Sequence, residues 1–227
     1  MKELKNIKVS VISMKSDIER RQQISLLFGK YSLKYSFIDA INGKNLLAKD
    51  YYPLTKNPNF LFNRRHIISP SEVGCRLSHK NAIIDFISNT NQEWLLIFED
   101  DITFNDSLLD FLSSVDNLIF DDSIIIHLGG QNGLPSSRRL VLRKDHMFKA
   151  IKVKFIFPLC LRWLYRTCGY IINRSAAEKL IKAHNSTFVA DDWSYILKST
   201  SISKIYFINL ITHPTDLSNS TIENERI

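Results

Sequence analysis

The stretch that most constrains this chain is W-L-L-I-F-E-D-D-I-T-F, residues 94–104, in which an apolar run leads directly into three consecutive acids. Carboxylates this close together repel one another when they are ionised. Acids on a loop tip disperse that repulsion into water, but residues 99–101 lie between Phe98 and Ile102 and are less free to do so. Either these acids lie on a solvated loop tip, or a positive group lies among them.

The residues around this stretch alternate between strand and helix patterns. Apolar runs predict strands at residues 7–14, 34–38, 94–98, 123–128, 169–172 and 202–210. Apolar residues at helical spacing predict helices at residues 17–31, 71–88, 108–118, 175–184 and 193–198. Residues 51–68 show no clear period and are interpreted as an irregular connection. Strands that alternate with helices predict an α/β fold, with a mostly parallel central sheet flanked by helices.

Polar residues mark the expected starts of three of these helices. Asp17 is placed to cap the first helix, and Ser175 is the candidate cap of the helix at residues 175–184. Ser69 or Ser71 is expected to cap the second helix, where Glu72 suits the positive end of the helix dipole.

Length and composition predict one domain over residues 1–227, and no linker or repeat divides it. A hydrophobic content of 44% is enough to bury a substantial core. The first ten residues lack the apolar region of a signal peptide, and no run of about eighteen uncharged apolar residues predicts a spanning helix. The three cysteines (Cys75, Cys160 and Cys168) are not spaced as a metal knuckle, so free thiols in a reducing cytoplasm are expected.

Basic residues concentrate in one segment of the chain. Residues 138–166 contain nine Lys or Arg and one acid, a local charge of +8, whereas the rest of the chain carries −1. Five aromatic residues are interleaved with these bases: Phe148, Phe155, Phe157, Trp163 and Tyr165. This mixture fits an anionic membrane surface, a nucleic acid or an anionic substrate, and it also fits a solvated basic face over a core segment.

Polar residues follow four of the predicted strands, at residues 13–17, 39–43, 99–101 and 127–130. Ligands of open parallel sheets bind beyond the carboxyl ends of the strands. In an extended chain Glu99 and Asp101 project to one side and Asp100 to the other. Two carboxylates on one side can share a hard cation such as Mg²⁺ or Mn²⁺. Solvated loop acids and an acidic pocket like that of receiver domains are the alternatives.

Five ordered segments of the chain resemble the motifs of glycosyltransferase family 25, whose members include lipopolysaccharide and lipooligosaccharide galactosyl- and glucosyltransferases. The segments are V-I-S-M-K-S-D-I-E-R-R-Q, Y-S-F-I-D-A-I-N-G, S-E-V-G-C-R-L-S-H, W-L-L-I-F-E-D-D-I and C-G-Y-I-I-N-R-S-A-A-E-K-L. The third is the most distinctive. The resemblance implies a GT-A-like nucleotide-sugar-binding fold and inversion at the anomeric carbon.

The chain departs from the family pattern at several positions. Ser13 stands where the family usually has Asn, Ser36 and Phe37 match loosely, and Ala177 replaces a typical Gly. Residues 144–165 have no counterpart in the family pattern. These departures affect acceptor recognition more than the chemistry of transfer.

The resemblance implies a donor site built from the first four of these segments. Its expected members are Ser13, Arg20, Arg21, Asp39, Ala40, Gly43, Glu72, Ser78, His79 and Asp100. One of the two arginines is expected to reach the phosphates or the base, unless both are solvated. Asp39 either accepts a hydrogen bond from the ribose or base or forms an Asx turn. Because Ser78 and His79 point to different faces of the helix, at most one of them is expected to face the cleft.

A metal held by Glu99 and Asp101 would neutralise charge on the departing nucleoside diphosphate. Asp100 either ligates the metal or contacts the ribose. His213 is the candidate third ligand, with His127 as an alternative that is more simply a structural histidine.

Inversion needs a general base to deprotonate the acceptor hydroxyl. Asp191 and Asp192 in V-A-D-D-W are the candidates, with Asp192 slightly favoured, and capping of the following helix is the alternative. Trp193 either stacks on a sugar ring or packs in the core. Cys75 is interpreted as a small packed residue, because inverting transfer needs no covalent intermediate.

The leading hypothesis is an inverting, metal-dependent transferase that moves galactose from UDP-galactose to a lipooligosaccharide acceptor, with UDP-glucose as the alternative donor. It is expected in the cytoplasm, on the inner face of the membrane, with a lipid-linked oligosaccharide as acceptor. The competing hypothesis is a non-catalytic basic module that binds membrane or nucleic acid. Three acids in a binding cleft would repel nucleic-acid phosphates, so no nucleic-acid partner is expected.

Overall fold

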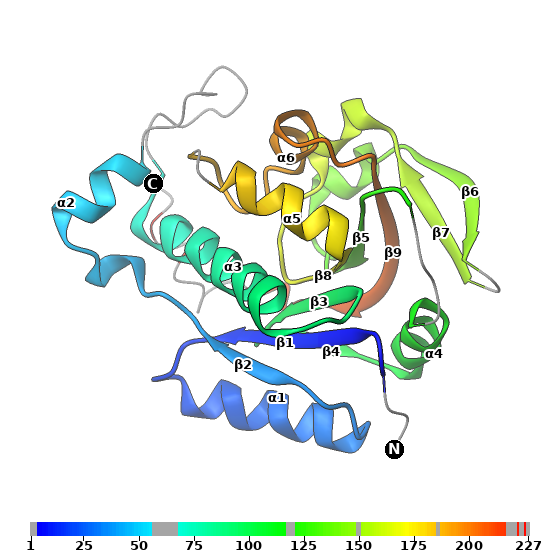
Figure 1. Ribbon diagram of the computed structural model, residues 1–227, viewed down its shortest axis with the longest axis horizontal. Coiled ribbons are helices and arrows are strands. Elements are labelled where there is room, and N and C mark those ends of the chain that lie inside the picture. Colours follow the sequence, from blue (N-terminus) through cyan, green and yellow to red (C-terminus); the bar gives the residue numbers. More distant parts are fainter. Residues whose placement is uncertain are drawn as a thin grey trace.

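The computed structural model describes residues 4–55, 68–116, 121–148, 151–184 and 187–216, together with Ile222 and Glu225. Within these residues one mixed sheet has the strand order β2-β1-β3-β8-β5-β9-β7-β6, and β4 pairs with β9 (Figure 1). The strands are β1 (Ile7–Ser13), β2 (Ser36–Asp39), β3 (Trp94–Glu99), β4 (Thr103–Phe104), β5 (Ile124–Gly129), β6 (Leu142–Phe148), β7 (Ile151–Ile156), β8 (Gly169–Asn173) and β9 (Lys204–Thr212).

Helices flank this sheet. They are α1 (Ile18–Lys30), α2 (Ala48–Tyr51), α3 (Pro70–Asn89), α4 (Asp106–Val115), α5 (Arg174–Ala183) and α6 (Trp193–Ser199). Short 3₁₀ helices occur at Gly43–Asn45, Tyr52–Leu54, Pro135–Arg139 and Pro158–Trp163. The predicted α/β architecture, a central sheet flanked by helices, is therefore confirmed.

The direction of the strands decides where their ends meet. β1 is parallel to β2 and β3, and β5 is parallel to β9. β8 is antiparallel to both of its neighbours, β3 and β5, so these two strands run in the same direction. The carboxyl ends of β1, β2, β3, β5 and β9 therefore lie at one edge, where β8 begins. The strand ends with polar residues converge there as the sequence predicts.

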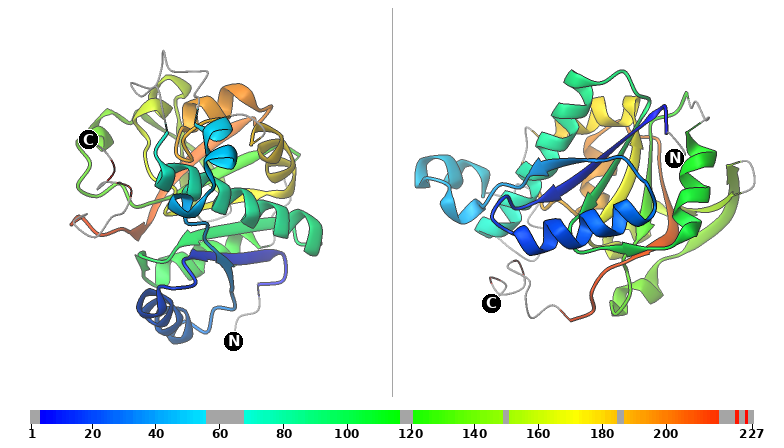
Figure 2. Two further views of the ribbon diagram at one scale, coloured as in Figure 1. Left: turned by 90° about the vertical axis from the view of Figure 1, so that its left-hand side faces the viewer. Right: turned by 90° about the horizontal axis from the view of Figure 1, so that it is seen from below.

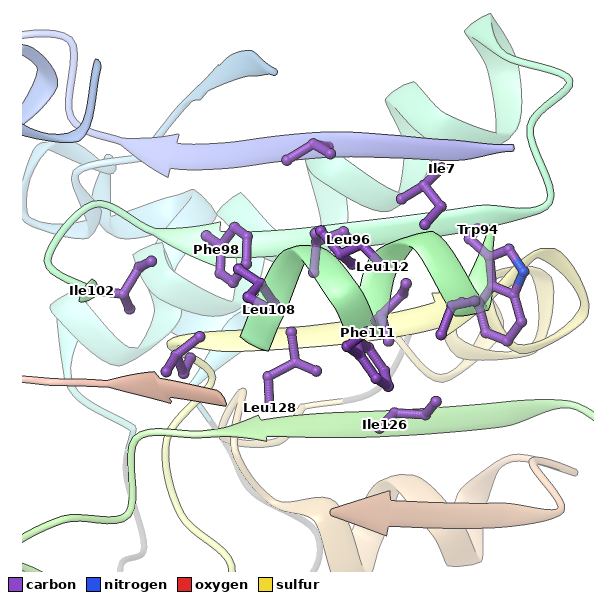
Figure 3. Packing of buried hydrophobic residues seen from close by; sticks show 14 of the residues in the cluster. Ile7, Trp94, Leu96, Phe98, Ile102, Leu108, Phe111, Leu112, Ile126 and Leu128 are labelled. Atoms are coloured by element: carbon purple, nitrogen blue, oxygen red, sulfur yellow. The ribbon is translucent and has the colours of Figure 1, made fainter. Parts of the chain in front are cut away.

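Strand β3 is buried on both faces, which explains its continuous apolar sequence. Trp94, Leu96 and Phe98 pack on the face covered by α1 and α4. Figure 3 shows these three side chains beside α4. Leu95 and Ile97 pack on the opposite face, which α3, α5 and α6 cover (Figure 2). Side chains of successive strand residues point to opposite faces, so alternate residues of the run pack in two different cores.

Two of the predicted helix starts are confirmed and one is wrong. Asp17 caps α1, and Ser69 caps α3 in a capping box with Glu72. α5 is capped by Asn173, whose Oδ1 accepts a hydrogen bond from the amide of Ala176 (3.2 Å), and not by Ser175. Because β8 ends at Asn173 and the helix begins at the next residue, Ser175 already lies in the first turn.

The basic segment contains structure that the sequence analysis does not predict. β6 and β7 form a hairpin that joins the sheet through β9. Val153 is buried in the core on one face of the sheet and Ile156 in the core on the other, whereas Lys152 and Lys154 are exposed. The irregular connection predicted at residues 51–68 is described only at its ends. Residues 51–54 contain the last residue of α2 and a short 3₁₀ helix, and residues 56–67 lie outside the described residues. No described helix is long and apolar enough to cross a lipid bilayer.

Candidate active site

A cleft of about 950 Å³ opens at the edge where the strand ends converge. Its walls come from the ends of β1 and β3, the starts of α1 and α3, the loop at residues 40–44, the loops that precede β8 and α6, and the segment after β9. Segments far apart in the sequence therefore contribute to one concave surface. Most of the predicted site residues line this cleft.

The acid triplet does not continue as an extended strand. β3 ends at Glu99, and Asp100 and Asp101 lie in a turn. The guanidinium of Arg20 reaches both aspartates, at 3.2 Å from Asp100 and 3.6 Å from Asp101. Arg20 is thus a positive group among the acids, and the predicted separation of Asp100 from its two neighbours is wrong. The turn lets Asp100 and Asp101 share the guanidinium of Arg20.

The two aspartates differ in their ionisation. Burial raises the pKa of Asp100, although hydrogen bonds from Ser13 and Arg20 oppose this. Burial also acts on Asp101, but its contacts with His213 and Arg20 outweigh it and lower the pKa of this carboxyl. The Nε2 atom of His213 lies 3.3 Å from Oδ2 of Asp101. An ionised Asp101 between two partners is the acid best prepared to face a cation.

The residues around Asp101 fit the expected divalent metal. Its Oδ1 atom is buried and has no hydrogen-bond partner among the described residues. A buried carboxylate oxygen without a partner is costly unless a cation or donor satisfies it. Carboxylate oxygen and imidazole nitrogen are ligands that Mn²⁺ accepts, and Mg²⁺ accepts the carboxylate. Asp101 would therefore supply a carboxylate oxygen to the metal shell, and His213 an imidazole nitrogen once Nε2 has given up its proton.

Glu99 has different neighbours. Its Oε1 atom accepts a hydrogen bond from the hydroxyl of Thr167 (2.6 Å) and lies 3.2 Å from Nε2 of His79. The other ring nitrogen of His79 lies 3.0 Å from the hydroxyl of Tyr170. Glu99 lines the same cleft as Asp101, and its place in the metal shell stays a prediction.

The two arginines of α1 have separate surroundings. Arg21 donates to the carbonyls of Ser13 (2.9 Å) and Met14 (3.1 Å) and pairs with Asp39, an exposed carboxylate whose pKa this contact lowers. Arg21 therefore ties the ends of β1 and β2 together. Among the described residues Arg20 lines the cleft, whereas Arg21 and Asp39 lie beside it. The donor-binding roles predicted for Arg21 and Asp39 are untested.

The loop that carries Ala40 and Gly43 is fixed against α3. Ser78 accepts a hydrogen bond from the amide of Ile41 (2.8 Å) and donates to the carbonyl of Gly74 (2.7 Å). A side chain at Gly43 or Gly74 would collide with backbone of the other segment, so both positions need glycine for this close approach. Ser78 and Gly43 line the cleft and also hold its wall in place. His79 lines the cleft as well, so the prediction that at most one of Ser78 and His79 faces it is wrong.

The two candidate bases point in different directions. Asp192 caps α6 by accepting a hydrogen bond from the amide of Tyr195 (2.9 Å), and burial raises its pKa. Asp191 lines the cleft, and its Oδ2 accepts a hydrogen bond from the amide of Arg166 (2.9 Å). The geometry therefore favours Asp191 as the residue that meets an acceptor, in contrast to the slight preference for Asp192 from sequence.

Arg166 is a cleft residue that sequence reasoning missed. It has a φ of 67°, a conformation that residues other than glycine rarely adopt, and its guanidinium is held by the carbonyls of Gly130 and Asn132. Its carbonyl accepts hydrogen bonds from His127 (3.0 Å) and from the indole of Trp193 (3.3 Å). Its sequence context, R-T-C-G before a strand, carries no recognisable signal.

His127 and Trp193 are core residues. His127 is fully buried, both of its ring nitrogens have backbone partners, and burial lowers its pKa to about 4. Trp193 is 1% exposed and packs edge-on against Tyr170 and His127. These contacts favour the structural alternatives that the sequence analysis left open for both residues.

The C-terminal region also reaches the cleft. Glu225 accepts hydrogen bonds from the amide and hydroxyl of Ser71 (2.9 Å each) and pairs with Lys44 at 3.1 Å. Ile222 is among the residues that line the cleft. Glu225 thus bridges the start of α3 and the loop beside it, which no sequence pattern indicated.

An α/β sheet with a carboxylate-lined cleft beyond its strand ends defines a class of ligand-binding enzymes. The chain belongs to glycosyltransferase family 25, described as LPS biosynthesis protein, whose profile matches residues 6–195. The resemblance seen in the five motifs is confirmed, and membership of a transferase family disfavours the non-catalytic basic module.

Two curated relatives are named as glycosyltransferases, and one of them is named as a family 25 member. The chain is 30% identical over 121 residues to a putative glycosyltransferase of Haemophilus influenzae, covering 52% of this chain and 40% of that protein. It is 25% identical over 187 residues to a glycosyltransferase 25 family member of Drosophila melanogaster, covering 78% of this chain and 28% of that protein. The chain therefore spans less than half the length of either relative.

Two solved structures show a distant likeness to this chain. TarS 1–349 of S. aureus in complex with UDP-GlcNAc has a TM-score of 0.46 at 14% identity, covering 98% of this chain and 62% of that one. The galactosyltransferase LgtC in complex with donor and acceptor sugar analogues has a TM-score of 0.38 at 9% identity, covering 88% and 72%.

Proposed function

We propose that this chain transfers a hexose from a UDP-sugar to a lipooligosaccharide or lipopolysaccharide acceptor, with inversion at the anomeric carbon. Galactose is the favoured sugar and glucose the alternative. The observation that carries the proposal is a buried oxygen of Asp101 that has no hydrogen-bond partner among the described residues, next to His213 and Arg20, in a cleft of a family 25 chain. This arrangement suits a donor that brings a diphosphate and a divalent cation.

The donor side of the cleft supplies positive charge where the diphosphate leaves. Asp101 and His213, with Glu99 as the predicted further ligand, would hold Mn²⁺ or Mg²⁺, and the ion supplies charge neutralisation of the leaving diphosphate. Arg20 lies 3.2 Å from Asp100 and 36% of its side chain is exposed, so it has room to turn toward an incoming phosphate. The role of Asp100, as metal ligand or ribose contact, belongs to the same proposal.

The acceptor side offers Asp191 as general base. In the proposed step the acceptor hydroxyl attacks the anomeric carbon, its proton passes to the Asp191 carboxylate, and the bond from the anomeric carbon to the diphosphate oxygen breaks. The UDP leaves with the electron pair of that bond. The hydrogen bond from the amide of Arg166 to Oδ2 fixes the position of the Asp191 carboxylate at the wall of the cleft.

The basic segment of residues 138–166 is proposed to dock the protein on the anionic inner leaflet, near a lipid-linked acceptor. Lys152 and Lys154 are exposed, and Leu159 is 74% exposed close to Phe157, which is 39% exposed. The guanidinium groups of Arg139 and Arg162 lie 4.3 and 4.9 Å from the centre of the Trp163 ring.

Bases beside exposed apolar side chains fit a lipid surface, where each base contributes about 1 kcal/mol. Lys149 lies outside the described residues. The cytoplasmic location follows from this docking and is proposed with it.

A donor screen tests the proposal directly. The purified chain is incubated with UDP-galactose, UDP-glucose and UDP-N-acetylglucosamine, with Mn²⁺, with Mg²⁺ or with chelator, and UDP release and transfer to a lipooligosaccharide acceptor are measured. We expect Mn²⁺-dependent turnover of UDP-galactose, or of UDP-glucose if glucose is the sugar transferred. No turnover of any UDP-hexose with either metal would overturn the proposal.

A further inference from the structure

A second cluster of metal-ligating side chains lies on the other side of Glu99. Cys75 and His79 occupy positions i and i+4 of α3, a spacing that places them on one face of the helix. Glu99 meets this face from the end of β3. One ligand atom from each of the three residues lies within 4.8 Å of the other two. A thiol, an imidazole and a carboxylate therefore converge on one small volume.

We propose that Cys75, His79 and Glu99 bind a thiophilic divalent cation such as Zn²⁺. Sulfur, imidazole nitrogen and carboxylate oxygen are all ligands of Zn²⁺, and a thiolate selects against Mg²⁺, which prefers oxygen. This site goes beyond the proposed sugar transfer, because the donor cation is assigned to the oxygen-rich side of the cleft around Asp101. Glu99, which lies between the two sites, was also predicted to ligate the donor cation.

Two hydroxyl groups orient the ligands of this site. The hydroxyl of Tyr170 lies 3.0 Å from Nδ1 of His79, so Nε2 is the nitrogen that faces Glu99 and Cys75. Thr167 donates to Glu99 and lies 3.8 Å from the sulfur of Cys75. The Tyr170 hydroxyl can donate to Nδ1 or accept from it, so His79 can present a bare Nε2 to a cation. Such outer contacts are usual around metal-ligating histidines.

Binding of a cation would also change the state of the thiol. Burial raises the pKa of Cys75 well above its usual range, so the thiol keeps its proton in the absence of an ion. Zn²⁺ binding forms a zinc–sulfur bond and releases the thiol proton to solvent. Cys75 and Glu99 are partly buried and line the cleft, so an ion has a path to the site. Three protein ligands leave a fourth position for water, as in exchangeable zinc sites.

Cobalt titration tests the site without reference to catalysis. Co²⁺ is added to the reduced, chelator-treated full chain, and the near-ultraviolet charge-transfer absorption of a cobalt–thiolate bond is recorded, followed by displacement with Zn²⁺. Cys75→Ser removes the thiolate, and Cys160→Ser is the matched control because Cys160 lies outside the cluster. Tyr170→Phe removes the outer contact and keeps all three ligands.

We expect the wild type and Cys160→Ser to show the cobalt–thiolate band, and Zn²⁺ to abolish it. Cys75→Ser should lose the band, and Tyr170→Phe should keep it with an affinity about 10- to 100-fold lower. Absence of the band in the wild type at millimolar Co²⁺ would overturn the proposal, as would a band that persists in Cys75→Ser. Because the readout is absorption, failure of the donor screen would leave this result standing.

Discussion

Replacement of Asp191 by Asn separates its chemical role from its structural one. In the wild type the amide of Arg166 donates a hydrogen bond of 2.9 Å to Asp191. The carbonyl oxygen of an Asn side chain can accept the same hydrogen bond, so the loop should stay in place. The amide cannot take a proton from the acceptor. General-base catalysis contributes about 10²- to 10⁴-fold, so kcat should fall by that factor, which corresponds to about 2.7–5.5 kcal/mol in the barrier.

The neighbouring residue provides the matched control. Asp192 caps α6, and Asn is as good a helix cap as Asp, so Asp192→Asn should keep both the fold and kcat close to wild type. Asp192→Ala removes the cap and should lower the free energy of unfolding by about 1 kcal/mol, again with little change in kcat. The two aspartates should thus respond to the same substitution in opposite ways.

Initial rates of UDP release and acceptor glycosylation at saturating donor give kcat, and titration calorimetry with UDP gives donor affinity. Urea unfolding gives the stability of each variant. A large loss of kcat in Asp192→Asn, with Asp191→Asn near wild type, would show that the assignment from geometry is wrong. Loss of UDP binding in Asp191→Asn would move this residue to the donor site.

Two further predictions concern the surface and the core. Changing Lys149, Lys152 and Lys154 together to Gln should weaken co-sedimentation with anionic vesicles by up to about 100-fold, at about 1 kcal/mol per base, and leave transfer to a soluble acceptor unchanged; equal binding of both proteins would refute docking. His127 and His184 are buried with pKa values lowered to about 4 and about 3, so the unfolded chain takes up protons below pH 6.5 that the folded chain does not. From pH 6.5 to pH 5 each histidine should therefore lower the free energy of unfolding by about 2 kcal/mol. Urea unfolding of His184→Leu, which keeps only His127, should show about half of the combined loss of the wild type. A wild type equally stable at both pH values would contradict the prediction.

Features of the fold that depend on local sequence were predictable. The run before Glu99 reads as a buried strand because both of its faces are covered. Asp17 and Ser69 cap their helices through hydrogen bonds to residues three positions further along the chain. Contacts this local can be predicted from a single sequence. The convergence of polar strand ends followed from the alternation of strands and helices alone.

Features that depend on tertiary contacts were not predictable. The turn after Glu99 separates this acid from Asp101, and its stability rests on Arg20 from a distant helix. The position of Arg166 depends on carbonyls of residues 130 and 132, about 35 positions away in the chain. Sequence patterns contain information on periodicity and on neighbours along the chain. They therefore predicted which residues line the cleft better than they predicted which residues contact one another there.

The most direct test of the central claim is transfer from the UDP-sugar donor by the wild type and by Asp101→Asn, each measured with chelator and with added Mn²⁺. The variant should keep the fold, as judged by circular dichroism, because Asn occupies nearly the same volume. We predict that Mn²⁺ restores turnover in the chelator-treated wild type and that Asp101→Asn shows no metal-stimulated turnover. Near-normal transfer by Asp101→Asn in the presence of chelator would contradict a metal-assisted donor site at Asp101.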